Sequence, residues 1–286
     1  MKRLTGLVAA LCCLFATAIG QAKDNALLYK ITRKGQAQPS YLFGTFHLLC
    51  KADLPTDSTL FRALGSTSTL CLEIDVTDAK TMMGAMQMMM MPEGQDWQAT
   101  LPADTLLKMD SVFKARTKMS LAAMKRLKPF AIMTMLLPSF LPCTAQSLEM
   151  QLAAYAKPRG IAMAQLETVE RQMKAVDATP LAEQVRDLKE LMTKPDSASQ
   201  ALVKMMDAYK QRQLSQVQAM MEEQERQGAM NAEAMLNSRN REWVPVMKQM
   251  MGDKSVFFAV GAGHLPGQQG VIALLRKEGY TVQPVW

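Results

Sequence analysis

Strand-like segments lie at both ends of this chain, and a long helical stretch separates them. Apolar, β-branched and aromatic residues fill the expected strands 26–33, 39–47, 69–76, 160–167, 254–263 and 280–286. Apart from the interruption at 160–167, the region 78–250 has helical apolar spacing, with prolines at its breaks. Because strands need partners, those from the two ends are expected to pair. The sequence therefore predicts an α/β (α+β) fold, with a central mixed sheet of N- and C-terminal strands and a large helical insert.

The only two histidines of the chain occupy the same local frame. The sequence GTFH (44–47) ends one expected strand, and GAGH (261–264) ends another. Ligands of open α/β sheets lie beyond the carboxyl ends of the strands, which is where both imidazoles are expected. A single histidine there is more often structural, but two in matched frames favour a shared site. Since neutral imidazole is the commonest metal ligand, we expect His47 and His264 to bind one metal ion.

Such a site needs at least one more oxygen or sulfur ligand. Glu73 lies among apolar residues in LCLEIDV, Asp75 faces the same side, and Glu167 ends the expected strand 160–167. Glu149 is a weaker candidate, because an exposed helix position would also explain it. Two histidines and one carboxylate leave open positions that suit Mn, Fe, Co or Zn. The alternative for Glu73 and Glu167 is a salt bridge to a buried arginine such as Arg239.

The N-terminus has the pattern of a secretory signal peptide. A short basic start precedes the uncharged apolar run 7–19 and then small residues, so we expect residues 1–22 to be removed and residues 23–286 to form the mature domain, with its helical insert at roughly 78–250. No later stretch has the ~18 uncharged apolar residues of a membrane-spanning helix. The net charge of +7 is spread along the chain and does not favour a nucleic-acid partner. We expect a periplasmic or secreted protein.

Three cysteines remain after such processing. Cys71 lies in an expected buried strand, whereas Cys50 and Cys143 lie in loop-like contexts. An oxidising compartment favours one disulfide, for which we expect Cys50–Cys143. The alternative is three reduced, buried cysteines.

The segment TMMGAMQMMMMP (81–92) contains seven methionines. As a helix it places Met82, Met86, Met89 and Met90 on one face. Three interpretations are open, in this order: a flexible substrate-side surface near the cleft, ordinary core packing, and Cu(I) binding by thioethers. The 26 methionines of the whole chain argue that the bias is general.

Five segments resemble the TraB/GumN family, which includes the Tiki metal-dependent peptidases: SYLFGTFHLL, LEID, QLETVERQ, LNSRNREWVPVM and FFAVGAGHLPGQQGVIALLRKEGYTV. The resemblance covers nearly the whole mature chain. It implies an α/β core with a helical insert. It also implies a divalent-metal hydrolase site around the two G-x-x-H histidines and a glutamate, which fall on His47, His264 and Glu73. The Leu-Glu-Thr segment falls on Glu167, and the Arg-Asn pair falls on Arg239 and Asn240.

These observations predict an exported metal-dependent hydrolase, most concretely a peptidase with a peptide or protein substrate. A divalent metal, with Mn, Co and Zn as candidates, would lower the pKa of bound water and polarise a carbonyl. Glu73 or Glu167 would complete the ligand set or act as general base, and Arg239 and Asn240 would donate to a developing oxyanion. The alternative for this pair is a helix-end salt bridge and cap. The alternative function is a non-catalytic periplasmic protein that holds a metal or a haem-like ligand in the same pocket.

Overall fold

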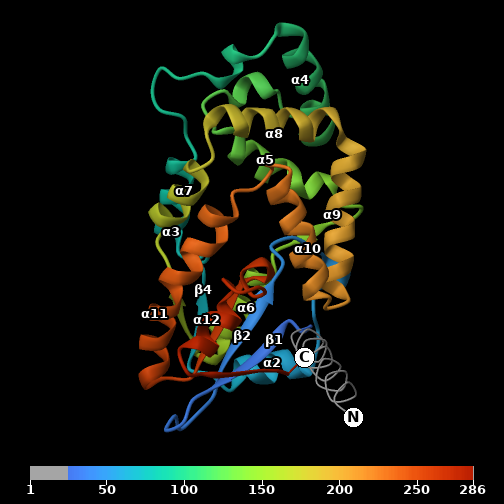
Figure 1. Ribbon diagram of the computed structural model, residues 1–286. Helices are drawn as coiled ribbons and strands as arrows, with labels where there is room; N and C mark the ends of the chain where they lie inside the picture. The colour runs from blue at the N-terminus through green and yellow to red at the C-terminus, as the bar shows by residue number, and fades with distance from the viewer. Residues whose placement is uncertain (1–24, 286) are drawn as a thin grey trace, which may run out of the picture.

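The sheet combines strands from both ends of the chain. The computed structural model describes residues 25–285, so the expected signal peptide 1–22 lies outside the described residues. Within them, six strands form one mixed sheet in the order β6-β4-β7-β2-β1-β8 (Figure 1). The strands are β1 (Leu28–Thr32), β2 (Ser40–Thr45), β4 (Thr69–Leu72), β6 (Ala162–Gln165), β7 (Val256–Gly261) and β8 (Thr281–Pro284). The predicted fold class is confirmed.

Four neighbouring strands, β6, β4, β7 and β2, run parallel, while β1 and β8 pair antiparallel at one edge. Thr45 lies opposite Gly261, and Leu72 lies opposite both Gln165 and Ala259. The parallel strands therefore end at a common edge. Everything that follows their last residues is gathered there, as expected for an open α/β sheet.

Two of the parallel strands end earlier than the sequence predicted. Glu73 was expected inside strand 69–76 and Glu167 inside 160–167, but β4 ends at Leu72 and β6 at Gln165. Beyond these ends the two backbones stay joined, because the amide of Glu167 donates to the carbonyl oxygen of Glu73 at 3.1 Å. The two glutamates thus lie just past the sheet edge, as the histidines do.

Helices fill most of the remaining chain. The longer ones are α2 (Ser58–Gly65), α3 (Ala79–Met88), α4 (Ala103–Thr117), α5 (Pro129–Leu136), α6 (Leu148–Ala156), α7 (Val169–Asp177), α8 (Leu181–Thr193), α9 (Pro195–Lys210), α10 (Leu214–Arg226), α11 (Ser238–Asp253) and α12 (Val271–Lys277). Short helical segments are η1 (Lys51–Asp53), η2 (Trp97–Thr100), η3 (Leu121–Met124), η4 (Leu137–Phe140), η5 (Lys157–Arg159), η6 (Glu233–Asn237) and η7 (Ala262–His264). No helix in residues 25–285 is long and apolar enough to cross a membrane.

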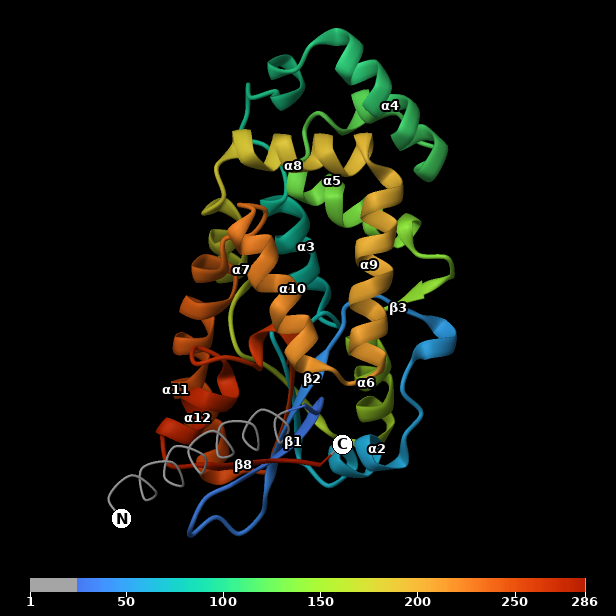
Figure 2. The ribbon, with the colours of Figure 1, turned by 45° about the vertical axis from the view of Figure 1, so that its right-hand side comes forward.

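The helices form a layer on each side of the sheet and a cap beyond its edge. α2 and α6 lie on one side of the strands, and α11 and α12 lie on the other (Figure 2). The cap of α4, α5 and α8 has its own apolar core, which includes Trp97, Phe113, Ile132 and Leu188. A separate cluster around Ala85, Val169, Met173 and Val176 joins α3 to α7. The cap therefore has a core of its own, whereas α6, α9 and α11 of the insert pack into the sheet core.

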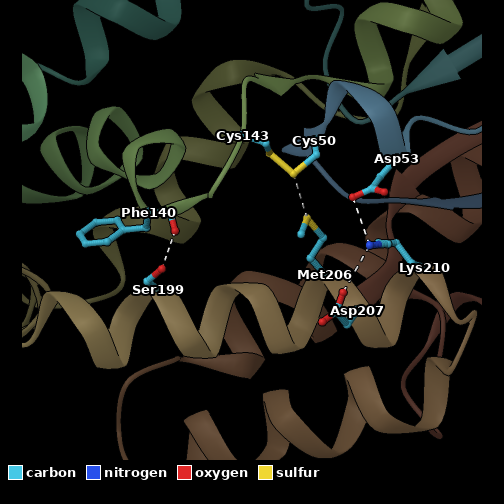
Figure 3. Close-up of a disulfide and its surroundings, with 8 residues drawn as sticks. All are labelled: Cys50, Asp53, Phe140, Cys143, Ser199, Met206, Asp207 and Lys210. Atoms are coloured by element: carbon cyan, nitrogen blue, oxygen red, sulfur yellow. Dashed lines mark hydrogen bonds and ion pairs between the residues drawn. A yellow bond between two sulfur atoms is a disulfide. The ribbon is translucent and has the colours of Figure 1, made fainter.

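A disulfide ties the first G-x-x-H segment to the insert, as predicted. Cys50 and Cys143 are bonded with their Cα atoms 5.5 Å apart (Figure 3). Beside them a two-residue ladder, β3 (Leu49–Cys50) with β5 (Ala145–Gln146), was missed by the sequence prediction, because two residues are too few to show a strand period. Cys71 is the remaining described cysteine; it is free and buried, and burial raises its pKa to about 12.

Helix α9 packs along this disulfide. The Met206 sulfur lies 4.0 Å from Cys50 Sγ, and Lys210 bridges Asp53 of η1 at 3.2 Å and Asp207 at 3.4 Å (Figure 3). Met206 and Lys210, one turn apart on α9, thus contact the segment from Cys50 to Asp53 that follows the first histidine motif.

Replacing both Cys50 and Cys143 with serine should lower the free energy of unfolding by about 2–5 kcal/mol, because the bridge closes a long loop in the unfolded chain. Urea unfolding would measure the loss. A thiol reductant should lower the stability of the parent protein to that of the double variant and leave the variant unchanged. Equal stability of parent and variant without reductant would contradict this role.

Candidate active site

The two G-x-x-H motifs lie side by side at the carboxyl edge of the sheet. β2 and β7 are adjacent, and the chain turns into η7 directly after Gly261. A Cβ atom at Gly44 would lie 3.0 Å from Leu265 Cδ2 and 3.1 Å from Ala262 Cα. Glycine at position 44 therefore lets the second motif pack closely against the first.

Gly261 marks the point on which the polar side chains converge. A Cβ atom there would lie 3.3 Å from Glu73 Oε1, 3.5 Å from His47 Nε2 and 3.6 Å from His264 Cδ2. The glycine thus leaves a small space that three candidate residues surround. They come from the ends of three parallel strands, β4, β2 and β7.

His47 is oriented by Glu149, at the start of α6. Its Nδ1 donates to Glu149 Oε1 at 2.8 Å, and Ser147 Oγ donates to the other carboxylate oxygen at 2.8 Å. The protein around the imidazole displaces part of its water and so opposes protonation, but the hydrogen bond and charge of Glu149 outweigh this effect and raise the pKa of His47 to about 9. The same pair lowers the pKa of Glu149 to about 2 against the effect of burial. The His47 side chain is 67% exposed, so this is the open side of the site.

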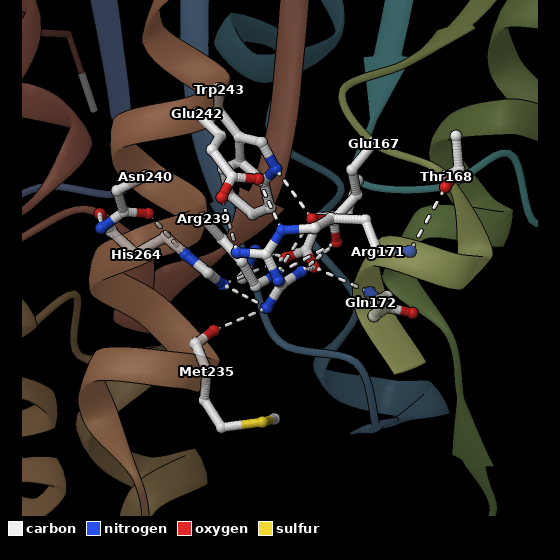
Figure 4. A network of polar contacts seen from close by, with 12 residues as sticks. Glu167, Thr168, Arg171, Gln172, Met235, Arg239, Asn240, Glu242, Trp243 and His264 are labelled. Atoms are coloured by element: carbon white, nitrogen blue, oxygen red, sulfur yellow. Dashed lines mark hydrogen bonds and ion pairs between the residues drawn. The ribbon is translucent and has the colours of Figure 1, made fainter. Parts of the chain in front are cut away.

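His264 is buried and is oriented by Asn240. Its Nδ1 lies 2.6 Å from Asn240 Oδ1, and its Nε2 lies 3.2 Å from Arg239 Nη1 (Figure 4). Because the guanidinium can only donate, Nε2 is the acceptor and Nδ1 carries the hydrogen. Burial, together with the charge of Arg239, lowers the pKa of His264 to about 3, although Glu73 acts in the opposite direction. The imidazole is therefore neutral at neutral pH.

Glu73 lies between the two imidazoles and Arg239. Its Oε1 accepts from the Gly261 amide at 2.8 Å and lies 3.7 Å from His264 Nε2. Its Oε2 accepts from Arg239 Nη2 at 2.5 Å and from Gln172 Nε2 at 3.3 Å. Burial alone would raise the pKa of Glu73. His264, which is protonated at the acidic pH where Glu73 titrates, and Arg239 outweigh it and lower that pKa to about 2.

Arg239 connects the site to the surrounding elements (Figure 4). Its Nη2 bridges Glu73 and Glu167 at 2.5 and 2.6 Å, and its Nε donates to Glu167 at 3.0 Å. Trp243, one turn along α11, donates to Glu167 Oε2 at 3.0 Å and lies beneath the guanidinium, 4.7 Å from its centre. The carboxylates raise the pKa of Arg239 despite burial, so this buried cation is permanent.

The segment before α11 supplies the last acceptor of Arg239. η6 is a π-helix, a form that leaves carbonyl groups out of the usual i→i−4 ladder. The carbonyl oxygen of Met235 accepts from Arg239 Nη1 at 2.7 Å. Every N–H group of the guanidinium then has an acceptor.

The structure brings His47, His264, Glu73, Glu167, Arg239 and Asn240 together. Asn240 does not point donors into open space, because its Nδ2 donates to the carbonyl oxygens of Gln269 and His264 at 2.8 and 3.3 Å. Asp75 turns away and accepts from Thr77. Glu149 was underrated by sequence, because nothing in its local pattern shows that the first turn of α6 faces His47.

Metal-binding geometry is not complete in the described part of the chain. No group of three or more His, Cys, Asp or Glu side chains within it is arranged to hold a metal ion. The lone pairs near Gly261 are instead partly engaged by a cation of the protein itself, because Arg239 donates hydrogen bonds to both His264 and Glu73.

The TraB/PrgY/gumN family matches residues 27–284, which include every residue of this site. The chain belongs to this family.

Two curated relatives are distant. Metalloprotease TIKI2 of Danio rerio is 22% identical over 93% of this chain, and Metalloprotease TIKI1 of Homo sapiens is 24% identical over 92%. The chain spans 62% of the length of each. No solved structure matches the chain. Membership of the family is thus shown by sequence, and the structure shows which residues surround each motif in this chain.

Replacing Arg239 with methionine should lower the free energy of unfolding by about 3–5 kcal/mol, because Glu73 and Glu167 would remain buried without a cation. Arg241→Met is the matched control, since Arg241 is exposed and pairs with Glu233, and it should change stability little. Adding Glu167→Gln to Arg239→Met should recover part of the loss. Equal losses for the two arginine variants would contradict the prediction.

The metal-free protein should lose stability as pH falls from 6.5 to 4.5. His264 has a folded pKa of about 3 against 6.5 when unfolded, so the unfolded chain binds a proton there that the folded chain does not. His47 has a folded pKa of about 9 against 6.5 when unfolded, so the protein should also lose stability as pH rises from 6.5 to about 9. Urea unfolding in chelator would measure the slope, and His264→Asn should flatten it between pH 6.5 and 4.5. A slope unaffected by this variant would show that another group titrates.

Proposed function

We propose that this protein is an exported metal-dependent hydrolase, and most concretely a peptidase. The observation that supports this function is the convergence of His47 Nε2, Glu73 Oε1 and the His264 ring on one point beside Gly261. The names of both curated relatives, which are called metalloproteases, agree with it.

The chemistry of the donor set fits a divalent metal held by His47, His264 and Glu73. Metal-binding histidines usually donate their other ring N–H to a carboxylate, carbonyl or water. Glu149 and Asn240 do this for His47 and His264, so Nε2 is the nitrogen of each that would face a metal, and in His264 it now accepts from Arg239. A bound divalent metal would supply Lewis-acid polarisation of a carbonyl and a water of lowered pKa, and Mn, Co and Zn are the candidates.

Arg239 and its carboxylates then have positioning and donor roles. Glu167 has both oxygens engaged by Arg239 and Trp243, so we assign it to fixing the guanidinium rather than to proton transfer. If His264 Nε2 held a metal, one Nη1–H of Arg239 would have no acceptor and would be available to an oxyanion on the substrate.

Glu73 is the proposed ligand or general base. It is ionised at neutral pH, and its Oε1 faces the common space while Oε2 is held by Arg239. His47 must release its proton before it can bind a metal, which makes metal affinity fall in acid.

The substrate is proposed to be a peptide or protein that approaches from the His47 side. The His47 side chain is 67% exposed, whereas those of His264 and Glu73 are 5% and 10% exposed. The expected signal peptide and the Cys50–Cys143 disulfide support a periplasmic or secreted location.

The test is cleavage of an unbiased peptide mixture by protein loaded in turn with Mn, Co and Zn, read by mass spectrometry beside metal analysis. His47→Ala and His264→Ala should each lose metal and cleavage together. Glu149→Gln should weaken metal binding by about 10–100-fold, because His47 loses its charged partner. Glu190→Gln, an exposed glutamate of α8, is the matched control and should change neither.

Two further variants separate the roles. If Glu73 is the base, Glu73→Gln should keep the metal and lower turnover by about 10²–10⁴-fold; if it is a ligand, metal affinity falls as well. Arg239→Lys should lower turnover and leave metal content unchanged, since a point charge does not reproduce the guanidinium fork. Stoichiometric metal without cleavage under any loading would contradict the hydrolase and support a metal-binding protein. Full cleavage by the double histidine variant would refute the site.

A further inference from the structure

Four methionines on and just after α3 are exposed to solvent. Met82, Met83, Met86 and Met90 are 39%, 70%, 68% and 41% exposed. The general methionine richness of the chain does not explain this group. Only three other described methionines, Met119, Met135 and Met150, are comparably exposed, and each lies on a different part of the cap or α6.

The exposed methionines are not among the residues by which α3 packs. Ala85 is buried against α7, with Met88 and Met89 partly buried in the same cluster. Apolar packing of this segment is thus already provided by other residues. The exposed side chains contribute thioether groups without contributing to the described core.

Three of these residues occupy neighbouring positions on the helix surface. Met86 is four residues after Met82 and three after Met83, the two spacings that make neighbours on a helix. Because helical side chains lean towards the N-terminus, Met86 reaches back over the other two. Met90 lies beyond the end of α3, where it forms a β-bridge with Leu127, and it is not part of this set.

We infer that Met82, Met83 and Met86 form a binding site for a soft monovalent cation, namely Cu(I), with Ag(I) as its chemical analogue. Thioether sulfur is a soft ligand that selects Cu(I) over the harder divalent ions. A neutral three-thioether set has no carboxylate or imidazole to favour Mn, Co or Zn. This site is on α3 and is independent of the function proposed for the histidine site.

The test uses the full mature chain with its disulfide intact, in ascorbate, which keeps copper reduced without opening the bridge. The protein should withhold equimolar Cu(I) from the chromogenic chelator bicinchoninate. The triple variant Met82→Leu, Met83→Leu, Met86→Leu should leave all the Cu(I) to the chelator. Leucine is as good a helix former as methionine and equally apolar, so circular dichroism should show an unchanged fold.

The matched control is Met119→Leu, Met135→Leu, Met150→Leu, which removes the same number of exposed thioethers from scattered positions and should bind Cu(I) as the parent does. Addition of Ag(I) to protein labelled at the methionine methyl carbons should shift the NMR signals that the first triple variant lacks. Copper retained by that variant would place the ion elsewhere and overturn the inference. A parent chain that leaves all Cu(I) to the chelator would overturn it too.

Discussion

The buried guanidinium of Arg239 is the interaction on which the rest of the site depends. A cation is stable inside a protein only when its charge is balanced and every N–H has an acceptor. Glu73 and Glu167 balance the charge, and Met235 and His264 complete the acceptors. Since these partners lie after β4, after β6, in η6 and in η7, one side chain joins four separate parts of the chain.

The two imidazoles are positioned from outside the site rather than from within it. Glu149 holds His47 and Asn240 holds His264, each through Nδ1, so that the opposite nitrogens face the centre. Glu149 is itself placed by Ser147, the N-cap of α6, which follows β5 and the disulfide. The disulfide and its small ladder therefore act on the His47 side of the site as well as on stability.

Arg239 also sets a condition on metal binding. In the protein alone, the guanidinium donates to the lone pair of His264 that a metal would use. A metal bound to His264 Nε2 would replace this contact and would leave one N–H of Arg239 without an acceptor. Under the proposed function, occupancy of the site would thus be linked to the availability of a donor for the substrate.

The sequence by itself determined the elements that local pattern encodes: strands at both ends, a helical insert, two glycine-flanked histidines and the cysteines able to pair. The glycines at 44 and 261 could be noticed from the motif alone, but their reason is tertiary. Gly44 makes room for Ala262 and Leu265, and Gly261 makes room for Glu73 and the two histidines. The role of Glu149 was decided only by the fold, and the fold also fixed Arg239, which the sequence offered only as an alternative, as the buried partner of Glu73 and Glu167. Their side chains reach the site from residues far away in the chain, and the free energy of burying a charge depends on neighbours that no local pattern can show.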